Sequence, residues 1–167
     1  CVLRRGDMRP FYNRKKSEAG KAMTTKLLVG LDGHSSGKKA LAYGKQMSSV
    51  IGDCELLIVY VIEWSPYSFQ TAEENAERHK RREEEIATAM SRVVDPAVAD
   101  LKEAGIKARG IVRHGYVADT LDAVAVEEKA NQIIVCRSSD GSLANRIFGS
   151  ATATLVMNAS VPVTVIG

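Results

Sequence analysis

Short apolar runs alternate with longer amphipathic segments from Lys26 onwards. Residues 26–31 (KLLVGL) and 55–62 (ELLIVYVI) are almost continuously apolar, as expected of parallel strands that are buried on both faces. Residues 38–51 between them predict a helix with one apolar face, formed by Ala40, Leu41, Gly44, Met47 and Ile51. This succession of strand, helix and strand predicts a βαβ unit.

Turn residues divide the rest of the chain into similar units. Pro66 marks a loop, and the long charged helix after it is kinked or restarted at Pro96 before it ends at Gly105. Residues 107–113 (KARGIVR) predict a more polar strand at a sheet edge. The remaining elements are a helix over 117–129, a strand over 132–136, a helix over 150–158 and a strand over 162–166. The alternation predicts an α/β fold with a parallel sheet and crossover helices.

The long helix carries a run of charge, ERHKRREEE at residues 77–85. Residues one turn apart predict weak surface ion pairs, namely Glu74 with Arg78 and Glu77 with Arg81. Acidic side chains interleave with the basic ones, so the run favours a solvated face over a patch that binds nucleic acid. We therefore expect no nucleic-acid partner.

The composition is typical of a soluble globular protein. Of the 167 residues, 45% are hydrophobic and 26% are charged, and a single domain of this size can bury a sizeable core. No apolar run approaches the roughly 18 residues that span a bilayer, so we expect no membrane partner. The cysteines Cys1, Cys54 and Cys136 lack the spacing of a zinc site or a disulfide framework, which suits the cytoplasm. The three histidines are equally dispersed, and we expect no metal site.

The basic charge belongs to the first 22 residues. They carry seven basic and two acidic side chains, a net charge of +5, whereas residues 23–167 carry 16 basic and 18 acidic ones, a net charge of −2. A transit peptide or a nucleic-acid-binding arm is one interpretation of this segment. Because Met23 leads almost directly into the first apolar strand, we instead interpret residues 1–22 as an extension outside the native domain and residues 23–167 as the domain.

The turn after the first strand contains a possible nucleophile elbow. Gly33 to Gly37 fit the pattern G-x-S-x-G, with Ser35 as the nucleophile. Hydrolases of that fold place this serine after several strands and their histidine near the end of the chain. Ser35 follows the first strand, and the last histidine is His114, with two strands still to come. A Ser35 hydrolase is therefore only the enzymatic alternative.

The same turn also fails the phosphate-loop pattern, because it is one residue short and Lys38 is followed by lysine in place of serine or threonine. We interpret Asp32 and the Gly/Ser residues as a sharp turn that starts the helix, with Ser35 or Ser36 near the N-cap.

Ligands of open parallel sheets bind beyond the carboxyl ends of the strands, where the strand order reverses. If the first and fourth strands are neighbours, residues 30–37 and 136–150 line that crevice. Gly149 and Ser150 open the last helix, whose free N–H groups and dipole suit a phosphate. Asp32 can accept hydrogen bonds from a ribose or an adenine amino group. A purely structural role fits equally well, with Ser150 capping its helix and Asp32 turning the chain.

Four stretches together resemble the universal stress protein family: GLD at 30–32, LLIVYVIE at 56–63, VRHGYVADTLDAVAVEEKANQIIV at 112–135 and FGSATATLVMNASVPVTVIG at 148–167. The likeness covers residues 26–167. It implies a five-stranded parallel open sheet in the order 3-2-1-4-5 with helices on both faces, a Rossmann-like fold of the adenine-nucleotide alpha-hydrolase type. It also implies a homodimer formed through the C-terminal strand, Pro162–Ile166.

Family members that bind ATP carry the signature G-x2-G-x9-G followed by serine or threonine. Aligned on Gly149, this chain reads C-x2-S-x9-G-S, with Cys136 and Ser139 in place of the first two glycines. Glycine at such positions lets the backbone approach phosphate and adopt positive φ. Ser138, Ser139 and Ser142 offer hydroxyl groups in exchange.

By the same resemblance, Asp32 matches the family's nucleotide-contacting aspartate, Val61 the residue whose backbone meets adenine, and Ala151 a residue that contacts phosphate. The full predicted nucleotide site is Gly30, Leu31, Asp32, Val61, Val135, Cys136, Ser138, Ser139, Gly149, Ser150 and Ala151. The implied ligand is ATP or AMP, with Mg²⁺ accompanying ATP.

These observations predict a small dimeric stress-response sensor or regulator of the cytoplasm that binds an adenine nucleotide and has no catalytic residues. Weak hydrolysis of bound ATP is compatible with this prediction. The alternative is a family member that binds no nucleotide and acts as a protein-interaction module.

Overall fold

The computed structural model describes residues 24–63, 72–137 and 150–167. Its strands are β1 (Thr25–Leu31), β2 (Cys54–Glu63), β3 (Lys107–Gly115), β4 (Gln132–Cys136) and β5 (Val163–Ile166). All pair in parallel, in the order β3-β2-β1-β4-β5. The predicted fold class and strand order are confirmed, and the more polar third strand lies at an edge as expected.

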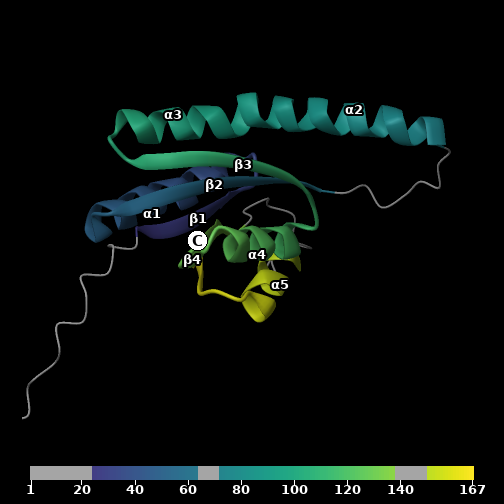
Figure 1. Ribbon diagram of the computed structural model, residues 1–167. Coiled ribbons are helices and arrows are strands. Elements are labelled where there is room, and N and C mark those ends of the chain that lie inside the picture. Colours follow the sequence, from purple (N-terminus) through teal and green to yellow (C-terminus); the bar gives the residue numbers. More distant parts are fainter. Residues whose placement is uncertain (1–23, 64–71, 138–149) are drawn as a thin grey trace, which may run out of the picture.

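Helices cover both faces of this sheet (Figure 1). One face carries α1 (Ser35–Ile51) and a long helical segment composed of α2 (Ala72–Ala89), the π-helical turn η1 (Met90–Val94) and α3 (Asp95–Glu103). The other face carries α4 (Val117–Glu127) and α5 (Ser150–Asn158). Right-handed crossovers require this division. The chain first moves in one direction along the sheet, from β1 to β2 and β3, and then crosses back to β4 and continues in the other direction to β5.

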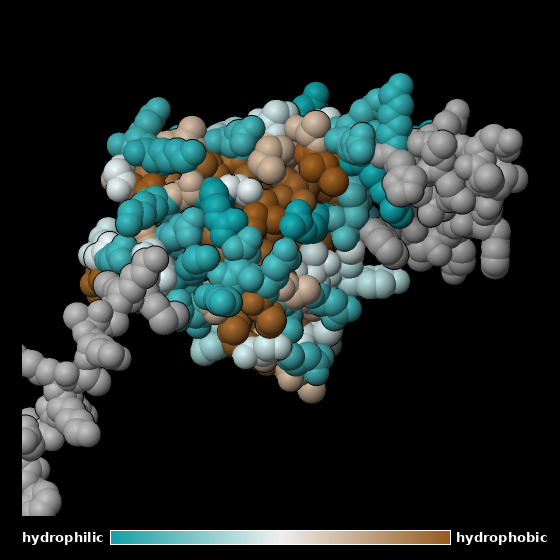
Figure 2. Space-filling model, viewed as in Figure 1, coloured by the Kyte–Doolittle hydropathy of each residue, from teal (hydrophilic) through white to brown (hydrophobic). Residues whose placement is uncertain are grey.

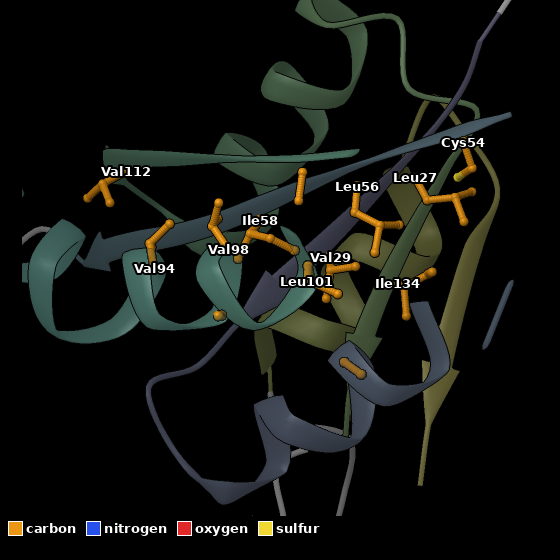
Figure 3. Close-up of a cluster of buried hydrophobic side chains, with 13 residues drawn as sticks. Leu27, Val29, Cys54, Leu56, Ile58, Val94, Val98, Leu101, Val112 and Ile134 are labelled. Atoms are coloured by element: carbon orange, nitrogen blue, oxygen red, sulfur yellow. The ribbon is translucent and has the colours of Figure 1, made fainter. Parts of the chain in front are cut away.

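Each face of the sheet has its own hydrophobic core. On the side of α1 and α3, strand residues such as Val29 and Ile58 are fully buried, and Figure 3 shows Val94, Val98 and Leu101 pointing from the helical segment towards the strands. The alternate residues of the same strands form the second core, against α4 and α5. Because successive strand residues point to opposite faces, a residue's position along its strand fixes the face that it occupies.

The outer surface of the long helical segment is polar, as the charged run predicts. Lys80, Arg81 and residues 83–85 are exposed. Figure 2 shows polar residues along this segment and apolar ones gathered between it and α4, where β3 forms the sheet edge. The side chains of residues 72–79 lie outside the described residues, and so do the predicted ion pairs. Within the described ranges, every helix is too short or too polar to cross a membrane.

The helical segment does not simply kink at its proline. Pro96 has no N–H group to donate to the carbonyl four residues earlier. The chain accommodates it with the π-helical turn η1, in which the N–H of Asp95 donates to the carbonyl of Met90, and α3 restarts with Pro96 in its first turn. α3 ends at Glu103, before Gly105 adopts a φ of +75°. The backbone stays helical through this turn, so the α-helical hydrogen-bonding pattern restarts at α3 while the helix itself is not broken.

The first helix ends at Ile51 as predicted, but its start and the exposure of its last residue differ from the prediction. It begins at Ser35, three residues earlier than expected. The predicted inner face is correct for Ala40 and Gly44, which are buried, but wrong for Ile51, whose side chain is 37% exposed. Ile51 is the last residue of α1, where the chain turns away at Gly52 with a φ of +85°.

Candidate functional site

The carboxyl ends of the central strands lie at one edge of the sheet. Leu31 pairs with Tyr60, so Asp32 follows β1 beside Val61 of β2. Val29 pairs with Ile134 of β4, and this register brings the end of β4 to the other side of Asp32. α5 must run from this edge to the opposite one, because it leads into the amino end of the parallel strand β5. Its N-terminus therefore opens towards the same edge as Asp32.

Asp32 holds the turn into α1 through three hydrogen bonds. Its Oδ1 accepts from the backbone N–H groups of His34 and Gly37, at 2.9 and 3.1 Å, and its Oδ2 accepts from the hydroxyl of Ser36. The carboxylate of Asp32 thus caps the N-terminus of α1. The residue at the N-cap position itself is His34, two residues later, and its side chain makes no capping bond. The interpretation of this turn as a helix start is confirmed.

These bonds also fix the charge of the site. Burial raises the pKa of Asp32, but the hydrogen bonds from Ser36 and from the N–H groups of His34 and Gly37 outweigh it and hold the pKa below its usual value. Asp32 is therefore an anion at neutral pH with a fixed orientation. A carboxylate has about four lone-pair directions, so one remains for a ligand.

Gly30, Val61 and Val135 lie on the face of the sheet that carries α4 and α5. Val61 and Val135 belong to the core on that side. A Cβ on Gly30 would lie 3.1 Å from Val135 Cγ1 and 3.2 Å from Leu121 Cδ1. Glycine therefore lets these two side chains close the floor beneath the end of β1. The three predicted residues are brought together on one side of the strands.

Cys136 and Leu31 point to the opposite face. Both pack against the core on the α1 side. The backbone of Cys136 has no positive φ, so a side chain is accommodated there without strain. Burial raises the pKa of the Cys136 thiol, and the charge of Asp32 adds to this against the opposing effects of Lys39 and Arg137. The thiol is thus a neutral packing group, on the far side of β4 from α5.

The remaining predicted residues are less fully described. Ser138, Ser139 and Gly149 lie outside the described residues, together with the rest of the loop from 138 to 149. Ser150 begins α5, and Ala151 follows it in a half-buried position. No group of three or more His, Cys, Asp or Glu side chains that could hold a metal exists among the described residues.

Among the described residues, the histidine that the elbow motif would need lies away from the turn. This histidine would be His114, which lies on the edge strand β3, separated from β1 by β2. The Nε2 of His114 lies 3.5 Å from Oε2 of Glu85 on α2. The serine that Asp32 engages is Ser36, whose hydroxyl is a donor to the carboxylate. Sequence reasoning missed this bond, although the four-residue spacing of aspartate and serine across a strand-to-helix turn is a signal for it.

Comparison with known proteins identifies the family. The model of the universal stress protein family matches residues 23–167, which is most of the chain. The protein belongs to the universal stress protein family. Among curated proteins, none matches.

Solved structures of other universal stress proteins share this fold. The chain is similar to universal stress protein UspA from Lactobacillus plantarum, with 19% identity, a TM-score of 0.67 and coverage of 86% of this chain and 98% of that one. It is similar to a family member from Arabidopsis thaliana with AMP bound, with 18% identity, a TM-score of 0.58 and coverage of 85% and 90%. It is also similar to a universal stress protein from Archaeoglobus fulgidus in complex with dAMP, with 15% identity, a TM-score of 0.55 and coverage of 86% of this chain and 98% of that one.

Proposed function

We propose that this universal stress protein binds an adenine nucleotide, ATP or AMP, at the carboxyl ends of β1 and β4. The observation that carries the proposal is the anionic, rigidly held carboxylate of Asp32 at the edge of the sheet towards which α5 opens. A carboxylate suits the hydroxyl groups of a ribose, and the start of a helix suits a phosphate. The structures of two relatives that contain AMP and dAMP support the same ligand class.

The proposed roles follow from position. Val61 lies beside Asp32 and would offer its backbone to adenine, with Gly30 and Val135 beneath it. Ser150 and Ala151 would receive phosphate at the first turn of α5. Magnesium would arrive with ATP, since this cation binds largely through phosphate oxygens and water.

We infer a sensing role in place of a catalytic one. A hydrolase needs a base positioned for water, and the carboxylate of Asp32, the one beside the proposed nucleotide, already accepts three hydrogen bonds. A homodimer through Pro162–Ile166 is part of the proposal, because β5 is an edge strand whose second side would otherwise be exposed. A single-chain mass by sedimentation equilibrium would contradict the dimer.

Nucleotide carried through purification is the first test. Protein purified without added nucleotide is denatured, and the supernatant is assayed by chromatography for adenine nucleotides. We expect ATP or AMP to be released, and the stripped protein to bind ATP with magnesium in calorimetry more tightly than GTP, the matched control. An empty supernatant together with no heat on adding ATP would overturn the proposal in favour of a protein-interaction module.

The side chain of Cys136 gives a second test. Cys136→Gly restores the first signature glycine, but the thiol packs on the α1 side of the sheet. We therefore expect ATP affinity to change by less than about threefold, below 1 kcal/mol. Stability should fall by about 1 kcal/mol, because a glycine in a strand loses packing and gains chain entropy. Calorimetry and urea unfolding measure the two effects. A large gain in affinity would mean that the thiol occupies the nucleotide crevice.

A further inference from the structure

A second hollow lies on the other face of the sheet, between α1 and the η1–α3 segment. Its volume is about 550 Å³, a size that suits a small molecule, and all its lining residues belong to the described part of the chain. The carboxyl end of β1, at Leu31 and Gly33, forms its inner end. We name it the α1–α3 groove. It shares Leu31 with the predicted nucleotide residues, but it opens on the α1 side, whereas Gly30, Val61 and Val135 of the proposed nucleotide crevice face α4 and α5.

The two walls of the groove are formed by residues that recur at helical spacing. Residues 38, 41, 42 and 45 fall on one stripe of α1, and residues 93, 96, 97, 100 and 101 fall on the facing stripe of η1 and α3. The small side chains of Ala42 and Ala97 leave the space between the walls unfilled. Leu31, Leu41 and Val93 give the groove an apolar lining.

The rim of the groove is cationic. Lys38 and Lys45 stand two turns apart on α1, and Arg92 stands on the opposite wall. All three are exposed, and none forms an ion pair with a carboxylate in the described ranges. The lining contains one carboxylate, that of Asp100. The groove thus combines apolar walls with an excess of unpaired positive charge.

The backbone of one wall is unusual. Arg92 and Val93 lie in the π-helical turn η1. Such turns occur frequently at functional sites, because they reposition side chains that a regular helix would aim elsewhere. Here the turn brings a cation and an apolar side chain to the rim and the wall of the same hollow.

The surroundings favour a compact ligand over an extended acidic peptide. The neighbouring hollow shares Arg92 with the groove, and its other charged lining residues are Arg81, Glu84 and Glu85 of α2, so it has no excess of positive charge. An extended acidic peptide leaving the groove in that direction would gain little there, whereas a compact anion can use the unpaired cations of the groove rim.

We propose that the α1–α3 groove binds a compact amphiphilic anion, an apolar ring system or short chain that carries one carboxylate or sulfonate. Its apolar part rests against Leu31, Leu41 and Val93, and its charged group lies between Lys45 and Arg92. The proposal does not depend on nucleotide binding.

The probe is 8-anilinonaphthalene-1-sulfonate, followed by fluorescence with the full chain, and the uncharged 1-anilinonaphthalene is its matched control. We expect saturable binding of one sulfonate probe per chain, at least about fivefold tighter than the uncharged analogue. Lys45→Glu and Arg92→Glu should each weaken the sulfonate by at least about fivefold and leave the uncharged probe within twofold. Ala42→Trp, which fills the groove, should weaken both probes.

Lys102→Glu makes the same charge change on α3 outside the groove and should leave both affinities within about twofold of the original. Binding of the uncharged probe by the charge variants shows that their fold and groove are intact. Equal affinity for the two probes, equal effects of Lys45→Glu and Lys102→Glu, or displacement of the sulfonate by ATP would each overturn the proposal.

Discussion

Replacing Gly110 with alanine is expected to destabilise the protein by about 3 kcal/mol, although alanine ordinarily stabilises a strand relative to glycine by roughly 0.5–1 kcal/mol. Gly110 lies on β3 beneath η1, and a Cβ there would lie 2.2 Å from Cγ1 of Val94 and 3.2 Å from Sδ of Met90. Val94 is fully buried, so it has no space into which to move. Overpacking therefore exceeds the gain in chain entropy, and urea unfolding should show a lower midpoint with an unchanged slope.

Val94→Ala supplies the control for this prediction. It removes the methyl group that the new Cβ would strike, at the cost of a cavity. The double variant Gly110→Ala, Val94→Ala should therefore lose less free energy of unfolding than the two single variants lose together. The difference should exceed the roughly 0.5 kcal/mol within which independent sites add. A neutral or stabilising Gly110→Ala would mean that η1 does not pack closely on β3.

Asp32→Ala is expected to cause the second large loss of stability. The substitution removes all three hydrogen bonds of the carboxylate. The N–H group of His34 loses its acceptor, and that of Gly37 keeps only its bond of 3.2 Å to the carbonyl of His34. We expect a loss of about 2 kcal/mol in the free energy of unfolding, at the upper end for a lost helix cap. If Asp32 also contacts the nucleotide, ATP affinity should fall by at least about tenfold. Unchanged stability would contradict the capping role.

The same residue predicts a pH dependence. Because the folded-state pKa of Asp32 is lowered, its contribution to stability is complete above the ordinary carboxyl pKa and is lost as the pH falls through the lowered value. Asp53 and Glu128 also have lowered pKa values, so the measurement is the difference in stability between the original protein and Asp32→Asn. This difference should shrink on acidification. A difference independent of pH would contradict the assignment.

Much of the fold follows from sequence patterns because parallel strands buried on both faces must be nearly continuous apolar runs. The runs at β1, β2 and β4 are unambiguous, and β5 is recognisable from its β-branched residues. Sequence patterns do not reveal η1: Pro96 signals a missing N–H group, but not that the turn before it is π-helical and packs Val94 on β3. Nor do they reveal the exposure of Ile51, which depends on where α1 ends.

The site was predictable where it depends on topology and less so where it depends on side-chain direction. The meeting of Asp32 and the start of α5 at one edge follows from the strand order. From residue identity alone, Cys136 in place of a signature glycine argues against nucleotide binding. In the structure the alternation of side chains along β4 turns its thiol to the α1 side, away from the proposed nucleotide. The bond from Ser36 to Asp32 and the cations of the α1–α3 groove depend on tertiary packing that no local pattern encodes.

The most direct test of the account is to record backbone amide spectra of the ¹⁵N-labelled protein as ATP with magnesium is added. The account predicts saturable shifts concentrated at Leu31, Asp32, Val61, Cys136 and Ala151, with the amides of Lys45 and Ala97 in the α1–α3 groove unchanged. No shifts, or shifts confined to the groove, would contradict the placement of the nucleotide at the carboxyl ends of β1 and β4.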